Sequence, residues 1–257
     1  MSSATYHTNF LTFTSAKAQG INQNGIVRSF VASKKNYLLF KRLFDILFSV
    51  FIIIVVLSWL LPLIAMLIKL DSKGSVFFKQ KRTGLNGKLF SCLKFRTMIS
   101  NDEADERQAD ENDDRVTAIG KFLRKTNMDE LPQFFNVLAG DMSIVGPRPH
   151  MITDCIRFSF VISSYQFRNL VRPGITGLAQ VKGYQGPTAD YESIIIRYYW
   201  DAQYVRKAGL WLDIKIIGIT IIQSLSNLIH IGFYIFRKTR KSAMMNRIHA
   251  GKRSSYE

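Results

Sequence analysis

The chain has 257 residues, of which 47% are hydrophobic, 35 are Lys or Arg and 19 are Asp or Glu. Its formal charge of +16 predicts an acidic partner, namely nucleic acid, anionic lipid or a phosphorylated substrate. The two cysteines, Cys92 and Cys155, lie far apart and outside any CxxC pair, so the sequence signals neither a disulfide framework nor a zinc site.

The N-terminal part combines a polar tail with a long apolar segment. Residues 1 to 36 contain no acidic residue and many Ser, Thr and Asn, which predicts a flexible basic tail. Residues 46 to 68 are 23 residues without a charge. At about 1.5 Å per residue, such a helix can cross a hydrocarbon core of about 30 Å. A buried core helix is the weaker alternative, because globular helices rarely stay apolar on every face.

The flanks of this segment favour a helix that re-enters the membrane. Lys and Arg lie on both sides of it, whereas a spanning helix carries them mainly on its cytoplasmic side. Pro62 lacks a backbone donor, and the hydroxyl of Ser58 could help satisfy the freed carbonyl one turn earlier. Residues 37 to 70 are therefore interpreted as a re-entrant membrane helix broken at Ser58 and Pro62. A single span kinked at Pro62 stays open.

Short strands are predicted next, followed by an acidic stretch. Residues 75 to 80 and 88 to 95 are rich in aromatic and apolar side chains and flank an Asn-Gly pair, which is typical of a hairpin. Residues 102 to 114 contain eight acids and one arginine. This stretch is most simply a solvated loop or exposed helix, and it leaves the rest of the chain still more basic.

Two adjacent acids, Asp129 and Glu130, stand at the start of another predicted helix. Thr126 or Asn127 is a suitable N-cap, and apolar residues follow at helical spacing up to Gly140. Acids in a first helical turn complement the helix dipole, so capping alone is one interpretation. The second interpretation is a catalytic site.

Cations near these acids favour a site that handles phosphate. Cationic side chains and glycine-rich turns neutralise phosphate oxygens, while a carboxylate can hold Mg²⁺ or attack phosphorus. Pro147 and Pro149 would hold the intervening arginine rigidly. The candidate phosphate-binding residues are Lys94, Arg96, Arg124, Arg148 and Arg172.

The C-terminal part contains two further predicted helices. Residues 188 to 209 carry Ile, Tyr and Trp along one side, which suits packing into the domain or lying at a lipid surface. Residues 214 to 236 are apolar enough for a second span, yet their polar residues and the basic stretch at 237 to 241 favour an interfacial amphipathic helix that contacts anionic lipid.

Long ordered motifs resemble a known family. They are FKRLFDILFSV, VFFKQKRTGLNGKLFSCLKFRTM, VTAIGKFLRKTNMDELPQFFNVLAGDMSIVGPRP, VRPGITGLAQVKGY and WLDIKII. Their content and order over about residues 37 to 220 resemble the bacterial sugar transferases, the monotopic polyprenyl-phosphate hexose-1-phosphate transferases. Members usually break the membrane helix at a Ser-Pro pair, whereas Trp59 follows Ser58 here. Larger relatives carry spanning helices before this core, so the chain resembles a minimal catalytic form.

The resemblance implies an α+β fold and a reaction. The fold would be a small mixed catalytic domain at residues 71 to 213, with a re-entrant membrane helix before it and an interfacial amphipathic helix and basic tail at residues 214 to 257. The enzyme would lie on the cytoplasmic face of a bacterial inner membrane. It would move hexose-1-phosphate from a UDP-sugar to undecaprenyl phosphate, release UMP, and start exopolysaccharide, capsule, O-antigen or glycoprotein glycan assembly.

The resemblance also assigns roles to the two acids. Asp129 would attack the β-phosphorus and form a covalent sugar-phosphoryl-aspartate, with Mg²⁺ near Asp129. Glu130 would orient Asp129 or the incoming phosphate. Two alternatives stay open: a UDP-N-acetylated sugar as donor, and a non-enzymatic, membrane-anchored basic binding module. No nucleic-acid-binding motif stands out, so nucleic acid is not expected as a partner. The sequence leaves a homodimer open.

Overall fold

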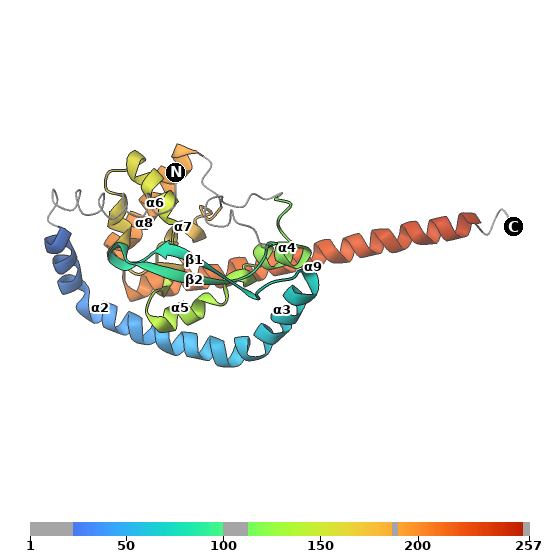
Figure 1. The fold of residues 1–257 in the computed structure, drawn as a ribbon, viewed down its shortest axis with the longest axis horizontal. Coiled ribbons are helices and arrows are strands. Elements are labelled where there is room, and N and C mark those ends of the chain that lie inside the picture. The colour runs from blue at the N-terminus through green and yellow to red at the C-terminus, as the bar shows by residue number, and fades with distance from the viewer. Residues whose placement is uncertain (1–22, 100–112, 187–189, 254–257) are drawn as a thin grey trace.

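The computed structural model describes residues 23 to 99, 113 to 186 and 190 to 253 (Figure 1). Its helices and strands alternate along the chain. The larger helices are α2 (Gln23–Ile52), α3 (Ser58–Asp71), α4 (Ala118–Lys125), α5 (Gln133–Ala139), α6 (Ile152–Val161), α7 (Leu178–Val181), α8 (Tyr191–Lys207) and α9 (Leu210–Arg253). The strands are β1 (Phe77–Thr83), β2 (Leu89–Phe95), β3 (Ser143–Val145) and β4 (Gly174–Thr176).

Two small sheets and the helices around them make up the domain. Strands β1 and β2 pair antiparallel, with Gln80 opposite Cys92 and Arg82 opposite Phe90. Strands β3 and β4 pair in parallel. The β3–β4 region is crowded, since a Cβ at Gly174 would lie 2.1 Å from the backbone nitrogen of Gly146. The predicted mixed α+β fold is confirmed, and so is the hairpin, whose first strand begins and ends a few residues later than predicted.

Helices α2 and α3 form one curved arm along a side of the domain (Figure 1). Residues 23 to 36, predicted as part of the flexible tail, belong to α2, which has a kink at Lys34. The remainder of that tail, residues 1 to 22, lies outside the described residues. The helical arm therefore begins earlier than the sequence pattern indicates.

The arm changes helical geometry before Ser58. Residues Ile53–Leu57 form a π-helical turn, which widens the helix and lengthens the reach between donors and carbonyls. The indole Nε1 of Trp59 donates to the carbonyl of Val55 at 3.0 Å. Pro62 lies inside α3 and cannot donate to the carbonyl of Ser58. Thus the change in geometry lies one to two turns before Pro62, and the indole of Trp59 serves a carbonyl within it.

An ordinary surface helix packs its apolar face against the domain and exposes its polar face. Helix α2 does the reverse. The face against the domain carries Lys41, Asp45 and Ser49, all buried. The outer face carries Leu47 and Phe51, which are 61% and 56% exposed. Exposed apolar surface of this extent marks contact with membrane or protein. The apolar N-terminal helix therefore fits membrane association, whether it re-enters or spans.

A second helix also meets the size and composition of a membrane helix. Both Ser33–Asp71 and Leu210–His230 are long and apolar enough to cross a membrane. Helix α9 runs behind the domain and then projects well beyond it (Figure 1). The helix predicted at residues 188 to 209 is observed as α8, where the side chain of Asp190 accepts from the Ser193 backbone N–H at 2.6 Å. The acidic stretch predicted as a loop lies largely outside the described residues.

A buried carboxylate joins α2 to the start of α9. Asp213 is 5% exposed, and its Oδ2 accepts from Lys41 Nζ at 2.8 Å and from the Tyr37 hydroxyl at 3.0 Å. Its Oδ1 lies 2.8 Å from the hydroxyl of Tyr204 on α8. Because this one side chain connects α9 to both α2 and α8, it fixes the arm to the domain.

We predict that Asp213→Asn destabilises the protein by about 3 to 5 kcal/mol, because it leaves the Lys41 ammonium buried without its counter-charge. Thermal unfolding in detergent should show a lower midpoint for this variant. The control is Asp114→Asn at an exposed position. Replacing both partners, as in Lys41→Met with Asp213→Leu, should recover much of the loss. Equal midpoints for Asp213→Asn and Asp114→Asn would contradict the assignment.

Candidate active site

Asp129 and Glu130 lie on a separate short turn between two helices. Helix α4 ends where the Thr126 hydroxyl donates to the carbonyls of Phe122 and Leu123 at 2.9 and 3.1 Å. A 3₁₀ turn, Met128–Glu130, follows, and α5 starts only at Gln133. The prediction that the acids occupy the first turn of the longer helix is therefore wrong.

The predicted cap is observed in part: Asn127 directly precedes the 3₁₀ turn but its side chain makes no capping hydrogen bond, and Thr126 ends α4. Asn127 has a left-handed backbone with φ 56°, so the chain reverses direction at the position expected to cap a helix. Pro132 stands directly before α5, where its missing N–H costs no helical bond. The predicted stop at Gly140 is confirmed by its left-handed conformation.

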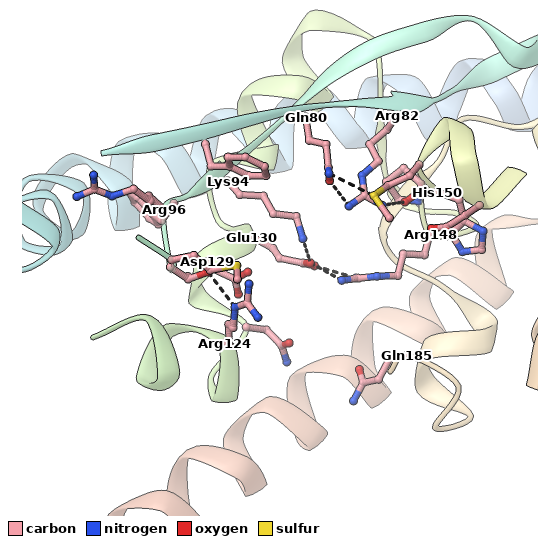
Figure 2. Close-up of a pocket in the computed structure, with 18 of the residues that line it drawn as sticks. Gln80, Arg82, Lys94, Arg96, Arg124, Asp129, Glu130, Arg148, His150 and Gln185 are labelled. Carbon is pink, nitrogen blue, oxygen red and sulfur yellow. Dashed lines mark hydrogen bonds and ion pairs between the residues drawn. The ribbon is translucent and has the colours of Figure 1, made fainter. Parts of the chain in front are cut away.

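A cavity of about 470 Å³ surrounds this turn. Its walls come from the β1–β2 hairpin, the end of α4, the turn after β3 and the face of α8. Figure 2 shows Asp129 and Arg124 on one side, Glu130 between Lys94 and Arg148, and His150 beyond them. The polar and charged lining residues include Gln80, Arg82, Lys94, Thr97, Arg115, Arg124, Asn127, Asp129, Glu130, Arg148, His150, Asp154, Gln185 and Arg197.

Glu130 is fixed between two cations. Its Oε1 lies 2.6 Å from Lys94 Nζ and 2.5 Å from Arg148 Nη2, and its Oε2 accepts from Arg148 Nη1 at 3.0 Å. Burial alone would raise the pKa of Glu130, but Arg148 and Lys94 hold it well below its usual range. Conversely, Glu130 raises the pKa of Arg148. The Glu130 carboxylate is therefore ionised, and both of its oxygens already accept hydrogen bonds from Lys94 or Arg148.

Asp129 is in a different state from its neighbour. Within the described residues its carboxylate makes no hydrogen bond or ion pair. Burial raises its pKa to about 6, Lys94 opposes that rise, and the charge of Glu130 adds to it. An ionised carboxylate without partners can bind a cation or attack an electrophile. Adjacent acids with separated pKa values typically have separate roles.

Arg124 and Arg148 are both held in place around the acids. Arg124 Nε donates to Thr97 Oγ1 at 2.8 Å, and burial lowers its pKa while Asp129 opposes that effect. The carbonyl of Arg148 accepts from Arg168 Nη2 at 2.6 Å. The structure thus brings Asp129, Glu130, Lys94, Arg124 and Arg148 together, as the sequence predicted for a phosphate site.

Arg96 contributes to the cavity wall, but its guanidinium points elsewhere. Its nitrogens donate to the carbonyls of Lys73 and Ser72 at 2.5 and 2.7 Å, where α3 ends. Figure 2 shows its guanidinium directed away from Asp129. A Cβ at Gly74 would lie 1.9 Å from Arg96 Nη1, so only glycine permits this approach. We therefore assign Arg96 to the end of α3 instead of to phosphate.

Arg172 does not line the cavity. Its Nε donates to the carbonyl of Gly140 at 2.8 Å, beyond the last turn of α5. Arg42 donates to the carbonyls of Val137 and Leu138 at 2.6 and 3.1 Å in the same region. Cations near a helix C-terminus complement its dipole. The sequence-based role of Arg172 in phosphate binding is therefore replaced by a role at the end of α5.

Sequence reasoning missed several cavity residues. Gln80 and Arg82 face inward because side chains alternate along β1, and the exposed Lys79 and Lys81 between them gave a usable signal. His150 and Arg197 come from the turn after β3 and from α8. No local pattern marks these two, because only the tertiary fold brings them to one cavity.

The predicted Mg²⁺ is compatible with the residues present only together with a ligand. Among the described residues, no group of three or more His, Cys, Asp or Glu side chains could hold a metal ion. Mg²⁺ is usually held by one or two carboxylates together with substrate phosphates and water. The unpaired Asp129 carboxylate supplies one such oxygen donor, so a diphosphate would have to supply others.

Comparison with known proteins identifies close relatives. A Klebsiella pneumoniae protein named UDP-glucose:undecaprenyl-phosphate glucose-1-phosphate transferase is 47% identical over 191 residues, covering 74% of this chain and 41% of the relative. An Escherichia coli (strain K12) protein of the same name is 44% identical over 191 residues, with the same coverages. An Aeromonas hydrophila UDP-N-acetylgalactosamine-undecaprenyl-phosphate N-acetylgalactosaminephosphotransferase is 46% identical over 186 residues, covering 72% and 43%.

The chain spans about two fifths of the length of these relatives. A family model described as bacterial sugar transferase matches residues 36 to 227. This range includes most of the arm, the cavity and the first part of α9, and it confirms the resemblance drawn from the motifs. Because the match covers most of its residues, the chain belongs to the bacterial sugar transferase family.

Proposed function

We propose that the chain is a phosphoglycosyl transferase. It moves hexose-1-phosphate from a UDP-sugar to undecaprenyl phosphate, releases UMP and thereby starts assembly of a surface glycan. The names of its relatives support the acceptor and the reaction class. The observation that carries the proposal is the asymmetry of the two acids: Glu130 is neutralised by two cations, while the adjacent Asp129 forms no ion pair within the part of the chain that the structure describes. Family membership removes the support for a non-enzymatic binding module.

In the first half of the proposed reaction, a carboxylate oxygen of Asp129 attacks the β-phosphorus of the UDP-sugar. The bond from that phosphorus to the bridging oxygen breaks, and its electron pair leaves with UMP. A sugar-phosphoryl-aspartate remains on the protein. Displacement of this kind depends mainly on positioning and charge neutralisation.

In the second half, a phosphate oxygen of undecaprenyl phosphate attacks the same phosphorus. The bond to Asp129 breaks and its carboxylate is restored, so the protein ends unchanged. Two anionic substrates, one in water and one in lipid, would repel each other if they met directly. A covalent intermediate lets them occupy the cavity in turn.

Several cations at different positions in the cavity would neutralise the negative charge of the substrate phosphates. Lys94 and Arg148 keep fixed positions because Glu130 bonds to both. Arg124, oriented by Thr97, faces the Asp129 side of the cavity. Asp129 would hold Mg²⁺, which would supply further positive charge to polarise the phosphoryl oxygens.

The surface of the protein supports a place at the membrane. The exposed apolar face of α2 suits lipid, and we propose that the α2–α3 arm re-enters the cytoplasmic leaflet of the bacterial inner membrane. On α9, Ile221, Ile222 and Ile229 are each more than half exposed, which suits an interfacial helix. The basic stretch at residues 237 to 241 would then contact anionic headgroups.

The names of the relatives differ in the donor sugar. Relatives whose names specify glucose and N-acetylgalactosamine are 47% and 46% identical to this chain. Overall identity therefore does not separate a hexose from an N-acetylated sugar. We propose a hexose because VKGYQGPT resembles the corresponding stretch of glucose and galactose transferases.

We predict that Asp129→Asn lowers UMP release by about a thousandfold or more, since an amide is a far weaker nucleophile. Protein in lipid nanodiscs should be assayed with undecaprenyl phosphate, Mg²⁺ and a panel of UDP-sugars. Asp114→Asn is the matched control at an exposed position. Full activity of Asp129→Asn, or no UMP release by folded wild-type protein with any sugar, would overturn the proposal.

The pH dependence of the first half-reaction should follow Asp129. Only the carboxylate attacks, and burial raises its pKa to about 6. Single-turnover UMP release should therefore fall as the pH drops through about 6 and level off above it. A rate independent of pH between 5 and 8 would exclude Asp129 as the titrating nucleophile.

In Glu130→Gln, the fall in single-turnover UMP release on the acidic side of the pH profile (the acidic limb) should occur at lower pH. The negative charge of Glu130 raises the pKa of Asp129, and glutamine removes that charge. Lys94 and Arg148 would also be left to stabilise the Asp129 carboxylate alone. The measurement is the pH profile of single-turnover UMP release beside Asp114→Asn. A limb that stays in place or moves to higher pH would contradict the electrostatic coupling.

A further inference from the structure

The cavity has a second polar end that the proposed chemistry does not use. Arg82, His150 and Arg197 line it. Three of their nitrogens are buried and have no hydrogen-bond partner among the described residues: Arg82 Nε, His150 Nε2 and Arg197 Nε. In Figure 2, Arg82 and His150 lie on the Arg148 side of Glu130, opposite Asp129 and Arg124. Nitrogens from three separate elements are thus left without acceptors around one space.

His150 is a hydrogen-bond donor at this end. The side chain is 5% exposed, and its Nδ1 bonds to the Tyr165 hydroxyl. Burial raises the pKa of Tyr165 well above its usual range, so the hydroxyl keeps its proton, and it donates a hydrogen bond to Nδ1 because it has no other acceptor among the described residues. Burial, with the nearby Arg168 and Arg197, lowers the pKa of His150, so the ring is neutral. Its remaining proton therefore lies on Nε2.

Among the residues that the structure describes, neither Arg82 nor Arg197 forms an ion pair with a carboxylate. Arg82 donates to the Pro149 carbonyl at 3.2 Å and to the side chain of Gln80. Arg197, which is 8% exposed, donates to the carbonyl of Gly186. Both differ from Arg148, whose guanidinium is paired with Glu130.

The charge balance at this end favours an anion. Asp154, a lining residue, and Glu130 are the carboxylates that act on Arg82. Asp201, already paired with Arg168, is the one that acts on Arg197. Arg148 lies close to both arginines, so the cations still outnumber the carboxylates. Buried cations and buried N–H groups cost free energy until acceptors reach them. A neutral ligand would supply acceptors but would leave the excess positive charge, whereas a phosphate group supplies both oxygens and charge.

We propose that Arg82, His150 and Arg197 form the binding site for the phosphate of the departing nucleoside monophosphate. This inference rests on the proposed function. Attack by Asp129 requires the leaving group to depart on the opposite side of the phosphorus. The second end of the cavity lies across Glu130 from Asp129, and its three donors would receive the charge that builds up on the leaving oxygen.

This assignment separates two groups of cations. Lys94, Arg124 and Arg148 serve the phosphoryl group that is transferred, whereas Arg82 and Arg197 hold the group that leaves. Arg82 and Arg197 are binding residues and do not attack phosphorus. Their loss should therefore weaken affinity for UMP itself, in the absence of any donor sugar or lipid acceptor.

The test is the affinity of the full chain in nanodiscs for UMP, measured by calorimetry. Arg82→Gln and Arg197→Gln should each weaken UMP binding tenfold or more. Lys81→Gln is the matched control, because it removes one charge from the neighbouring position of β1 on the exposed face. It should change the affinity less than twofold. His150→Leu, which removes the Nε2 donor, should also weaken binding by several fold.

Each outcome of these titrations has a distinct meaning for the phosphate site. If wild-type protein binds no UMP, the proposed function fails together with the site. If it binds UMP and the two glutamine variants match Lys81→Gln, only the phosphate site is overturned. Uridine, titrated at millimolar concentration, should bind wild type and variants alike, and an equal loss for uridine would assign this end to the nucleoside instead.

Thermal unfolding midpoints must match wild type for this comparison. Where a glutamine variant does not fold, Arg82→Lys and Arg197→Lys replace it. Lysine keeps the charge but lacks the Nε–H and the planar fork of arginine. These variants should still weaken UMP binding more than Lys81→Gln does. An affinity equal to that of the control would overturn the proposal.

Discussion

The site depends on one buried interaction, the contact of Glu130 with Lys94 and Arg148. A buried carboxylate is tolerable only when cations and hydrogen bonds compensate it, and here both oxygens are engaged. The same contact joins strand β2 to the turn after β3, so it fixes two walls of the cavity. It also leaves Asp129 as the unpaired member of an adjacent pair. Glu130 thus holds the site together, whereas the neighbouring Asp129 carboxylate is available for chemistry.

A second buried carboxylate, Asp213, holds the α2–α3 arm against the domain. It contacts Lys41 on α2 and Tyr204 on α8 from the start of α9. These contacts explain why the inner face of α2 is polar while its outer face is apolar. A helix with this polarity is suited to lie between lipid and a folded domain. The arm is thereby held at a defined position against the domain that contains the cavity.

The sequence predicted the elements and residues whose signals are local. Alternation and an Asn-Gly pair predict the hairpin, and the family motif identifies the acids. Sequence-based prediction failed where the backbone departs from regular geometry or where contacting residues are distant in sequence. The left-handed Asn127 begins a separate 3₁₀ turn that carries the acids, and the π turn lies before Ser58. Arg96 and Arg172 look like phosphate ligands beside glycine or threonine, yet both bind carbonyls near helix ends. Such carbonyls have no sequence signature, so only the fold distinguishes these uses of arginine.

The covalent intermediate on Asp129 is the central claim, and intact-protein mass spectrometry tests it most directly. Protein incubated with Mg²⁺ and the preferred UDP-sugar, without lipid acceptor, should gain the mass of one hexose phosphate, located by peptide mapping to Asp129. The added mass should disappear when undecaprenyl phosphate is supplied, and it should not form on Asp129→Asn. UMP release that requires the lipid acceptor, with no change in protein mass at any time, would contradict the account.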